Sequence, residues 1–594
     1  MNISSDVLYP LSFGVELPAG GAASSAGGAA EYLRDPSICR LVDFFRNKGL
    51  PALKQEDRDE AWYQDWIDYQ AEHGIYASLL SPERYSSRGH RFDLRKLTRF
   101  LEVFAYFSPA HAYSLHVSFL GLFPILKSSN EPLKKEAIAR LEGGGLFAFA
   151  VSEKDHGSDL FSNEFTLKLA GSAGMVADGA KYYIGNANAA CMVSVLAKQC
   201  AAEPGGSKKR SPFVFFAIRP QEAAAYGDVR KIRTLGVRAA FVGQFEVKGH
   251  ELTEDDVIAR GRDAWDAAFG TVDFGKFFLG FGSIGICAHA FTEAADHLHR
   301  RVLYGKPVAE MPHIRTAMVT AFARLVAMKL YAYRALDYLH ASGKDDRRYL
   351  LFNAVQKARV STEGVKVLGL LAECVGARGV EAETYLEMAV RDAQLIPSLE
   401  GSTHINFTLT AQFIGPYFAP AQGEVPAPES VSLRQRDCEE NPYGMEAHDR
   451  NAKTVRFAHF LTAYEPLRSL PNVRTFVEQV EAFGSVVGDG ASALNASADA
   501  GLVIEIGKCF STIVFAQLIA ENCLSAAVTP ATVSVIFHAL IEDFSVQALK
   551  LSAMFPPGSN PRALLKGIVR VAETSTAEVQ SVAELIAMRY AGAR

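Results

Sequence analysis

The hydrophobic periodicity of this sequence changes twice along its 594 residues, and these changes limit the folds that it can adopt. From residue 31 to about 141, apolar side chains recur at spacings of three and four, which predicts an all-helical region. Residues 146–151, 181–195 and 213–218 are rich in β-branched and aromatic side chains between Gly, Asn and Asp turns. They predict a small β-barrel or sandwich that extends to about residue 247. Helical patterns return from about residue 265, so we expect an α+β fold that is mostly α.

The later helical patterns form four long amphipathic runs, over 277–301, 314–342, 346–374 and 385–396. Their length and short connections predict an antiparallel four-helix bundle. Residues 18–30 have the composition of a flexible linker, residues 201–211 that of an exposed loop, and residues 419–429 that of a Pro-rich linker. We therefore expect an N-terminal arm and linker (1–30), a helical domain (31–145), a β-domain (146–252), a bundle domain (253–418) and an additional helical domain (430–594).

The composition excludes several classes of function. A net charge of −5 and a pI near 6.3 give no general attraction for nucleic acid or anionic lipid. The eight cysteines occur singly, without a Cys-x-x-Cys pair, which is typical of reduced buried thiols. The histidine pairs His111/His116 and His297/His299 have spacings that do not place two imidazoles on one helix face, so no metal site is expected.

The sequence predicts no export segment at residues 1–13 and no membrane span in its most apolar long stretch. Residues 1–13 contain Asp6 and no basic residue before their apolar positions, which does not fit a signal or transit peptide. The most apolar long stretch, residues 502–528, is interrupted by Glu505, Lys508 and Glu521. It predicts a buried helix or helix pair and no membrane span. We therefore expect a cytoplasmic protein.

One acidic residue, Glu400, lies after a largely apolar stretch on a Gly-Ser-Thr turn that opens a new helix. Its neighbours Ile396, Leu399, Ile405 and Phe407 would strip water from the carboxylate if the turn were buried, which makes a carboxylate a stronger base. The alternative is a structural acid in the first turn of a helix, where the helix dipole favours it. The local pattern alone favours that structural interpretation.

Two other motifs have competing interpretations. Residues 280–285 (GFGSIG) match the Gly-x-Gly-x-x-Gly dinucleotide fingerprint but lie inside a helical run and not at a strand-to-helix turn. Small residues there predict a close approach of two bundle helices. Residues 152–159 (SEKDHGSD) predict a polar turn, which is either a solvated connection or a place where a Ser hydroxyl and backbone amides hold a pyrophosphate.

Six motifs occur in an order that identifies a family. They are FAVSE followed by GSD (149–159), GAKYYIGNA (179–187), RVLYGK (301–306), GARG (376–379), RDA (391–393) and EGST (400–403). Together, over roughly residues 35–415, they resemble the acyl-CoA dehydrogenase family. The predicted order of helical domain, β-domain and bundle is also the order in that family.

The resemblance implies that FAD lies between the β-domain and the bundle. It implies that Glu400 removes the α-proton of an acyl thioester while the β-hydrogen leaves as hydride to flavin N5. The backbone N–H of Glu400 and a flavin hydroxyl would stabilise the enolate-like oxygen. The implied flavin contacts are Phe149, Val151, Ser152, Gly157, Ser158, Tyr183, Gly185, Arg301, Tyr304, Glu373, Val375, Gly376, Ala377, Ser402 and His404. The implied substrate contacts are Ser158, Asp273, Lys276 and Gly401.

Several positions depart from the family pattern. Tyr183 and Gly185 stand where Trp and Thr are usual, which puts the route of the electrons to the acceptor in question. Lys276 replaces an Arg and loses its planar fork. The Gln that often follows the Arg301 motif is absent. Lys154, Asp155 and His156 add charges near the expected thioester entrance, where they face either water or a phosphopantetheine. Because the Gln after the Arg301 motif is absent, part of the adenosine contact must be made by other residues.

The region after residue 429 resembles the C-terminal extension of the larger family members, which covers the surface that smaller members use to form tetramers. This implies a homodimer. The implied activity is desaturation of an acyl-CoA or acyl-carrier-protein thioester in fatty-acid metabolism, with an electron-transfer flavoprotein as acceptor. The alternatives are an oxidase that uses O2, a dehydrogenase of carrier-bound acyl groups in secondary metabolism, and a regulatory or nucleic-acid-binding family member without activity.

Overall fold

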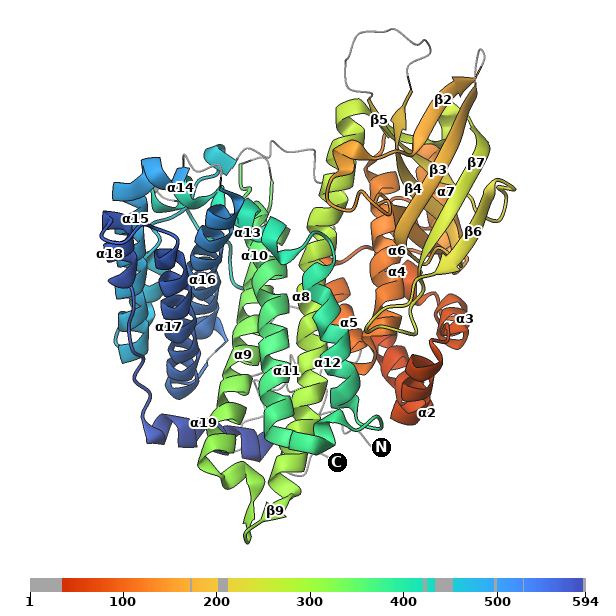
Figure 1. Cartoon of the computed structure of the whole chain (residues 1–594). Helices are drawn as coiled ribbons and strands as arrows, with labels where there is room; N and C mark the ends of the chain where they lie inside the picture. The colour runs from red at the N-terminus through yellow and green to blue at the C-terminus, as the bar shows by residue number, and fades with distance from the viewer. Residues whose placement is uncertain are drawn as a thin grey trace. The chain divides into compact units, whose positions relative to one another are not determined.

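The computed structural model describes residues 35–170, 174–200, 212–343, 345–419, 425–432, 452–495, 499–526 and 528–590 (Figure 1). The predicted arm (1–30), the predicted loop (201–211) and residues 420–424 of the predicted linker lie outside this part of the chain. The structure divides into two compact units. The first contains the described residues within Met1–Arg46, Leu279–Arg436 and His448–Arg594, and the second those within Asn47–Phe278.

The N-terminal region is helical, as predicted. Its helices are α2 (Pro36–Asp59), α3 (Gln64–Glu72), α4 (Ile75–Leu80), α5 (Leu94–Phe107), α6 (Pro109–Lys127) and α7 (Glu131–Glu142). Helix α6 begins where Ser108 caps it, with its side chain accepting a hydrogen bond from His111 N, and Pro109 occupies the first turn. Gly121 of α6 lies so close to β1 that a Cβ there would come within 2.6 Å of the backbone of Ala148. Helix α6 therefore packs directly on the sheet.

The β-region forms one mixed eight-stranded sheet in the order β6-β7-β3-β2-β4-β5-β8, with β1 paired to β4 in parallel. The strands are β1 (Leu146–Ala150), β2 (Thr166–Ala170), β3 (Gly174–Gly185), β4 (Ala190–Gln199), β5 (Phe213–Ile218), β6 (Tyr226–Lys231), β7 (Val242–Leu252) and β8 (Val257–Arg260). Alternate residues of these strands form an apolar core that includes Leu167, Val195, Phe216 and Phe245.

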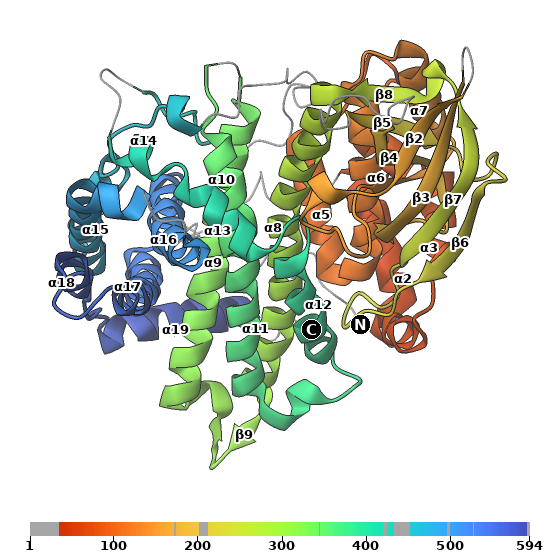
Figure 2. The same ribbon diagram turned by 45° about the horizontal axis from the view of Figure 1, so that its top comes forward.

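In the sequence, the helices of the bundle come after the strands. They are α8 (Gly261–Arg300), α9 (Pro312–His340), α10 (Tyr349–Val355), α11 (Ser361–Val375), α12 (Tyr385–Leu395), α13 (Thr403–Ala411) and α14 (Ile414–Phe418). Figure 2 shows α9 and α11 side by side. Helix α8 begins 16 residues earlier than the run predicted from 277. The early part packs through the aromatic side chains of Trp265, Phe269 and Phe274.

Two local features modify the bundle. The run predicted over 346–374 is interrupted by a π-helical segment, Gln356–Val360, between α10 and α11. The glycine motif at 280–285 lies inside α8, as predicted, and a Cβ at Gly280 would come within 2.2 Å of Gln356 Nε2. The close approach of two bundle segments at this glycine is therefore confirmed.

The additional C-terminal helices are α15 (Pro471–Asn495), α16 (Ala500–Ser525), α17 (Pro530–Ala553), α18 (Asn560–Lys566) and α19 (Thr576–Tyr590). Buried rings of Tyr464, Phe476, Phe537 and Phe544 fill the space between them. Helix α16 packs against α13 and α9, and α17 packs against α9. The extension and the bundle therefore belong to one compact unit.

Short elements complete the described chain. They are the hairpin β9 (Val302–Leu303) and β10 (Lys306–Pro307) and the 3-10 helices η2 (Leu160–Ser162), η3 (Glu254–Asp256), η4 (Val308–Glu310), η6 (Gly376–Val380), η7 (Ile396–Ser398), η9 (Ala452–Thr454) and η10 (Thr462–Leu467). Helices α8, α16 and α17 each contain an 18-residue window apolar enough to cross a membrane by length and composition. These windows are 94%, 67% and 67% buried within the protein, so much of their apolar surface is already covered.

Candidate active site

Glu400 lies in a sharp turn between η7 and α13. Its backbone has φ = 49°, and the next residue, Gly401, has φ = 79°. A non-Gly residue in this left-handed region is uncommon and costs about 1–2 kcal/mol. Such a conformation persists only where the surrounding structure fixes it. The new helix predicted after the turn begins at Thr403.

Two side chains hold this turn. Lys357 Nζ donates hydrogen bonds to Pro397 O at 2.5 Å and to Gly401 O at 2.6 Å. Asn406 Nδ2 donates to Gly401 O at 3.1 Å and to Ser402 O at 3.0 Å. The carbonyl of Gly401 therefore receives two hydrogen bonds from buried donors.

The apolar surroundings expected around Glu400 are only partly closed. Ile396 and Phe407 are buried, but Ile405 is 36% exposed and Glu400 itself is half-buried. The turn therefore lies at the surface of its unit. An acid in this position retains access to a ligand and to solvent.

The segment that follows β1 carries the first group of predicted flavin contacts. Phe149, at the end of β1, packs edge-on against Phe215 with ring centroids 5.9 Å apart. Val151 is buried, and Ser152 Oγ donates a hydrogen bond to Tyr182 O at 2.7 Å. Since Tyr182 precedes Tyr183, the structure brings Ser152 next to the second predicted group of contacts.

A buried ion pair between Lys181 and Glu153 holds this segment in place. Lys181 Nζ donates to Glu153 Oε1 and to Val151 O, each at 3.0 Å. The Glu153 carboxylate also accepts hydrogen bonds from the backbone N–H groups of Glu164 and Phe165. Burial lowers the pKa of Lys181 to about 8, although the carboxylate of Glu153 opposes this shift.

Tyr183 and Gly185 differ in their surroundings. Tyr183 has φ = 62° and is 58% exposed, so its ring is available to a ligand. Gly185 is buried, and a Cβ there would come within 2.6 Å of Val117 and 2.8 Å of Tyr113. The glycine therefore permits close packing of β3 on α6.

The polar turn at 152–159 forms a loop between β1 and β2. His156 and Glu153 exchange backbone hydrogen bonds of 3.2 Å, and Gly157 and Ser158 beyond them are exposed. No atom lies within 4 Å of the position that a Cβ of Gly157 would take. Lys154 and Asp155 are exposed, whereas His156 is half-buried.

The predicted substrate residues Asp273 and Lys276 form an ion pair one turn apart on α8. Lys276 Nζ and Asp273 Oδ1 are 2.6 Å apart, and the side chain of Lys276 is 6% exposed. The positive charge of Lys276 is therefore already compensated. An incoming anion would have to compete with Asp273.

A further group of predicted residues lies at the other end of the bundle from Glu400. Arg301 precedes the β9–β10 hairpin, and Tyr304 lies in its turn, where it is 97% exposed. Glu373, Val375, Gly376 and Ala377 form the junction of α11 with η6, where Gly376 has φ = 70°. Figure 1 shows the hairpin at the lower end of the bundle and α13 toward its upper end.

The length of the helices between them separates these two ends of the unit. Helix α11 alone has 15 residues, which corresponds to about 22 Å. Ser402 and His404 lie at the end with Glu400, with His404 exposed. The structure thus brings together Glu400, Gly401, Ser402 and His404 and places the Arg301 and Gly376 groups elsewhere.

Burial and neighbouring cations shape the electrostatics near the hairpin. Burial lowers the pKa of His297, and the guanidinium groups of Arg378, Arg301 and Arg300 lower it further. A concentration of positive charge at this end suits an anionic ligand.

Sequence reasoning assigned no role to four residues that shape the site: Lys357 and Asn406, and also Glu153 and Lys181, which occur in the FAVSE and GAKYYIGNA motifs. The available signal was a charged residue inside an apolar pattern, as at Lys357 between Val355 and Val360. A buried lysine of this kind needs hydrogen-bonding partners. Its partners are 40 and 44 residues away in the sequence, so no local pattern reveals them.

One group of potential metal ligands occurs among the described residues. Atoms of Glu56, Asp65 and His111 lie within 4.8 Å of one another. The ammonium of Lys48 pairs with Glu56 and, at 2.5 Å, with Asp65. This lysine already supplies the positive charge that the two carboxylates require.

Comparison with known proteins identifies the region that contains the turn. Residues 263–415 match the acyl-CoA dehydrogenase C-terminal domain. An acyl-CoA dehydrogenase of Bacillus subtilis (strain 168) is 24% identical over 375 residues, covering 63% of this chain and 95% of that protein.

Solved structures show the same fold. The acyl-CoA dehydrogenase of Bacillus anthracis complexed with FAD has a TM-score of 0.73 at 18% identity, and the match covers 95% of each chain. Butyryl-CoA dehydrogenase of Megasphaera elsdenii has a TM-score of 0.55 at 19% identity, covering 64% of this chain and 97% of that one. The additional C-terminal helices are thus shared with the first of these structures.

Proposed function

Because the chain is a member of the acyl-CoA dehydrogenase family, of the larger kind with additional C-terminal helices, we propose that it introduces an α,β double bond into an acyl-CoA thioester. The observation that carries this proposal is the left-handed turn at Glu400 and Gly401. It lies inside the region that matches the family and is held by buried donors.

Glu400 is the base in this proposal. The α-proton of a thioester is too weakly acidic for an ordinary solvated carboxylate, so the base must be precisely placed and the enolate-like oxygen stabilised. The fixed turn supplies the placement, and the backbone N–H of Glu400 is the proposed donor to the thioester oxygen. The proton moves to the Glu400 carboxylate, and the β-hydrogen leaves with its electron pair.

FAD, when bound, would supply the acceptor for that hydride. The residues of the second unit fit such a group because they offer both ring faces and polar donors. The half-buried ring of Phe149 and the exposed ring of Tyr183 flank a fixed Ser152. The exposed hydroxyl of Ser158, with open space at Gly157, suits phosphate oxygens.

The Arg301 and Gly376 groups support a homodimer. They lie at the other end of the bundle from Glu400, so we propose that they contact the FAD of a second copy. Light scattering of the purified protein should give twice the chain mass. A monomer that retains FAD and activity would contradict this part of the proposal.

Anaerobic addition of acyl thioesters to the FAD-loaded protein tests the proposed function. A panel from short to long chains, presented on CoA and on a carrier protein, should include at least one CoA thioester that bleaches the flavin. Product analysis should show the α,β-unsaturated thioester. Bleaching by carrier-bound thioesters alone would favour the carrier-protein alternative.

The acceptor is tested after reduction. Slow reaction with O2 and fast reoxidation by an electron-transfer flavoprotein support a dehydrogenase. Rapid oxygen consumption with peroxide release would instead indicate an oxidase. A purified protein that binds no FAD would favour a family member without this activity.

A further inference from the structure

Lys357 is a buried cation whose ammonium contacts the backbone on both sides of Glu400. The residue has no exposed surface, and its Nζ donates to Pro397 O at 2.5 Å and to Gly401 O at 2.6 Å. Burying an ammonium is costly, even when it is hydrogen-bonded, compared with burying an apolar side chain of similar size. A lysine at this position is therefore less favourable for stability than an apolar side chain of similar size would be.

The two acceptors of Lys357 bracket the turn. Pro397 O and Gly401 O belong to peptide groups on either side of Leu399 and Glu400, and both are bound to a single nitrogen atom. The turn cannot rotate as a unit without breaking at least one of these hydrogen bonds. The left-handed backbone of Glu400, which an isolated peptide would rarely adopt, is thereby fixed.

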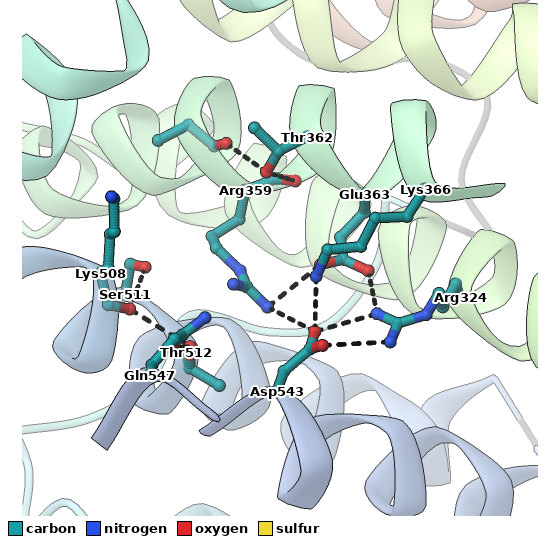
Figure 3. Close-up of polar contacts among 11 residues, drawn as sticks. Arg324, Arg359, Thr362, Glu363, Lys366, Lys508, Ser511, Thr512, Asp543 and Gln547 are labelled. Atoms are coloured by element: carbon teal, nitrogen blue, oxygen red, sulfur yellow. Dashed lines mark hydrogen bonds and ion pairs between the residues drawn. The ribbon is translucent and has the colours of Figure 1, made fainter. Parts of the chain in front are cut away.

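Lys357 is itself held by rigid neighbours because it lies in the π-helical segment Gln356–Val360. On one side of this segment, Gln356 packs against Gly280 of α8. On the other side, Arg359 pairs with Glu363 at 3.1 Å and with Asp543 of α17 at 3.5 Å (Figure 3). Single-turn π-helical segments are frequent at functional sites, where they redirect a side chain.

We infer that Lys357 is a positioning residue that holds the Glu400 turn in the conformation required for proton removal. It does not contact the reacting atoms in this role; it acts through the backbone carbonyls of Pro397 and Gly401. The inference rests on the proposed function, in which Glu400 is the base. Its structural part, that Lys357 holds the turn, does not depend on the reaction.

Three variants and one control test the inference. Lys357→Met removes the donors at similar side-chain length, Lys357→Gln keeps a neutral donor, and Lys357→Arg restores a cationic donor. Lys366→Met is the matched control, since Lys366 Nζ belongs to the same run of helix but donates to Glu363 and Asp543 and not to the turn. FAD content and melting temperature are measured for every variant.

The first readout is independent of the reaction. Amide hydrogen exchange is followed in the peptide that covers residues 396–407. Lys357→Met should speed exchange in this peptide at least about tenfold, whereas Lys366→Met should leave it within about twofold of the parent protein. If Lys357→Met does not fold, Lys357→Gln carries the same expectation with a smaller effect. Unchanged exchange in the folded variant would overturn the inference.

The second readout uses an acyl-CoA that bleaches the parent flavin. Misplacement of a catalytic group by about 1 Å can cost about 10²-fold in rate. Lys357→Met should therefore lower kcat by about 10²-fold with KM changed less than about threefold, and Lys357→Arg should recover part of kcat. A kcat equal to that of the parent, whether or not KM changes, would overturn the inference. A parent protein that reacts with no thioester would contradict the proposed function, while the exchange experiment would still decide the role of Lys357.

Discussion

Arg324 of α9 and Asp543 of α17 form a two-bonded ion pair, in which Nη1 and Nη2 donate to separate carboxylate oxygens at 2.9 and 3.2 Å. Arg324 Nη1 also donates to Glu363 Oε2 at 2.6 Å, and Arg359 and Lys366 complete the cluster (Figure 3). Two carboxylates thus meet three cations in a largely buried position. The cluster joins the bundle to the C-terminal extension.

Removing the Asp543 carboxylate from this cluster should destabilise the protein. Asp543→Ala leaves Arg324 and Arg359 without one of their acceptors in a buried position, and breaking a buried pair typically costs about 3–5 kcal/mol. Urea unfolding should show this loss. The neighbouring exposed acid gives a matched control, because Glu542→Gln is expected to change stability by less than about 0.5 kcal/mol. Equal effects of the two variants would contradict the role of the cluster.

The same cluster predicts an acid dependence of stability. Burial alone would raise the pKa of Glu363 and of Asp543, but the surrounding Lys366, Arg324 and Arg359 outweigh it and hold both pKa values below the ordinary 4.5 and 3.8. Because the unfolded chain binds these protons more readily, the stabilisation is complete above those ordinary values and is lost as the pH falls below them.

Unfolding of the parent protein and of Asp543→Asn between pH 7 and pH 3, in steps of about one pH unit, checks this prediction. The stability difference should be constant above about pH 5 and should shrink at lower pH. A difference that grows as the pH falls would contradict it.

A glycine of the extension should be needed for the position of α13. A Cβ at Gly507 of α16 would lie 2.1 Å from Phe407 O, a backbone atom of α13 that cannot move without shifting the helix after Glu400. Gly507→Ala should cost about 1–3 kcal/mol by overpacking and should also slow flavin reduction. Thermal unfolding and stopped-flow absorbance measure the two effects.

The control for this substitution is Gly369→Ala. Gly369 is an exposed glycine of α11 with no atom within 4 Å of a Cβ. Alanine there should stabilise the helix by about 0.5–1 kcal/mol. If Gly507→Ala behaved in the same way, α16 would not be closely packed on α13.

Lys181 predicts an alkaline dependence of stability in the second unit. Its pKa of about 8 in the folded protein lies below the ordinary 10.5. Between these values the unfolded state binds more protons than the folded state, so stability rises with pH. Relative to Lys181→Met, the unfolding free energy of the parent should rise by at most about 3 kcal/mol from pH 8 to pH 10.5.

Chemical denaturation across this pH range measures that difference. Lys168→Met is the control, since the side chain of Lys168 is 61% exposed. For Lys168→Met, the difference in unfolding free energy from the parent should not change with pH. The same result for Lys181→Met would show that burial does not destabilise the charged form of Lys181.

Local patterns predicted those elements whose side chains follow a regular period. Strand β5, Phe213–Ile218, lies where its aromatic and β-branched residues place it, and α12 ends one residue before the predicted limit. Strand β6, Tyr226–Lys231, was not predicted because its residues are largely exposed and polar. Its place in the sheet depends on pairing with β7 and not on its own sequence.

The site was predictable only in part. The position of Glu400 at a turn before a helix follows from the EGST pattern, but its catalytic role came from the resemblance to the family. The contacts of Lys357 with Pro397 and Gly401 depend on how distant segments pack, as does the π-helical segment that carries the lysine. A lysine inside a helical run gives no local sign of which carbonyls it will meet.

The reaction of Glu400→Gln with an acyl-CoA is the most direct test of the proposed function. The amide keeps the size of the side chain but cannot accept the α-proton. With FAD content and thioester binding equal to those of the parent, anaerobic flavin bleaching should slow by about 10²–10⁴-fold. Bleaching at the parent rate would contradict the assignment of Glu400 as the base.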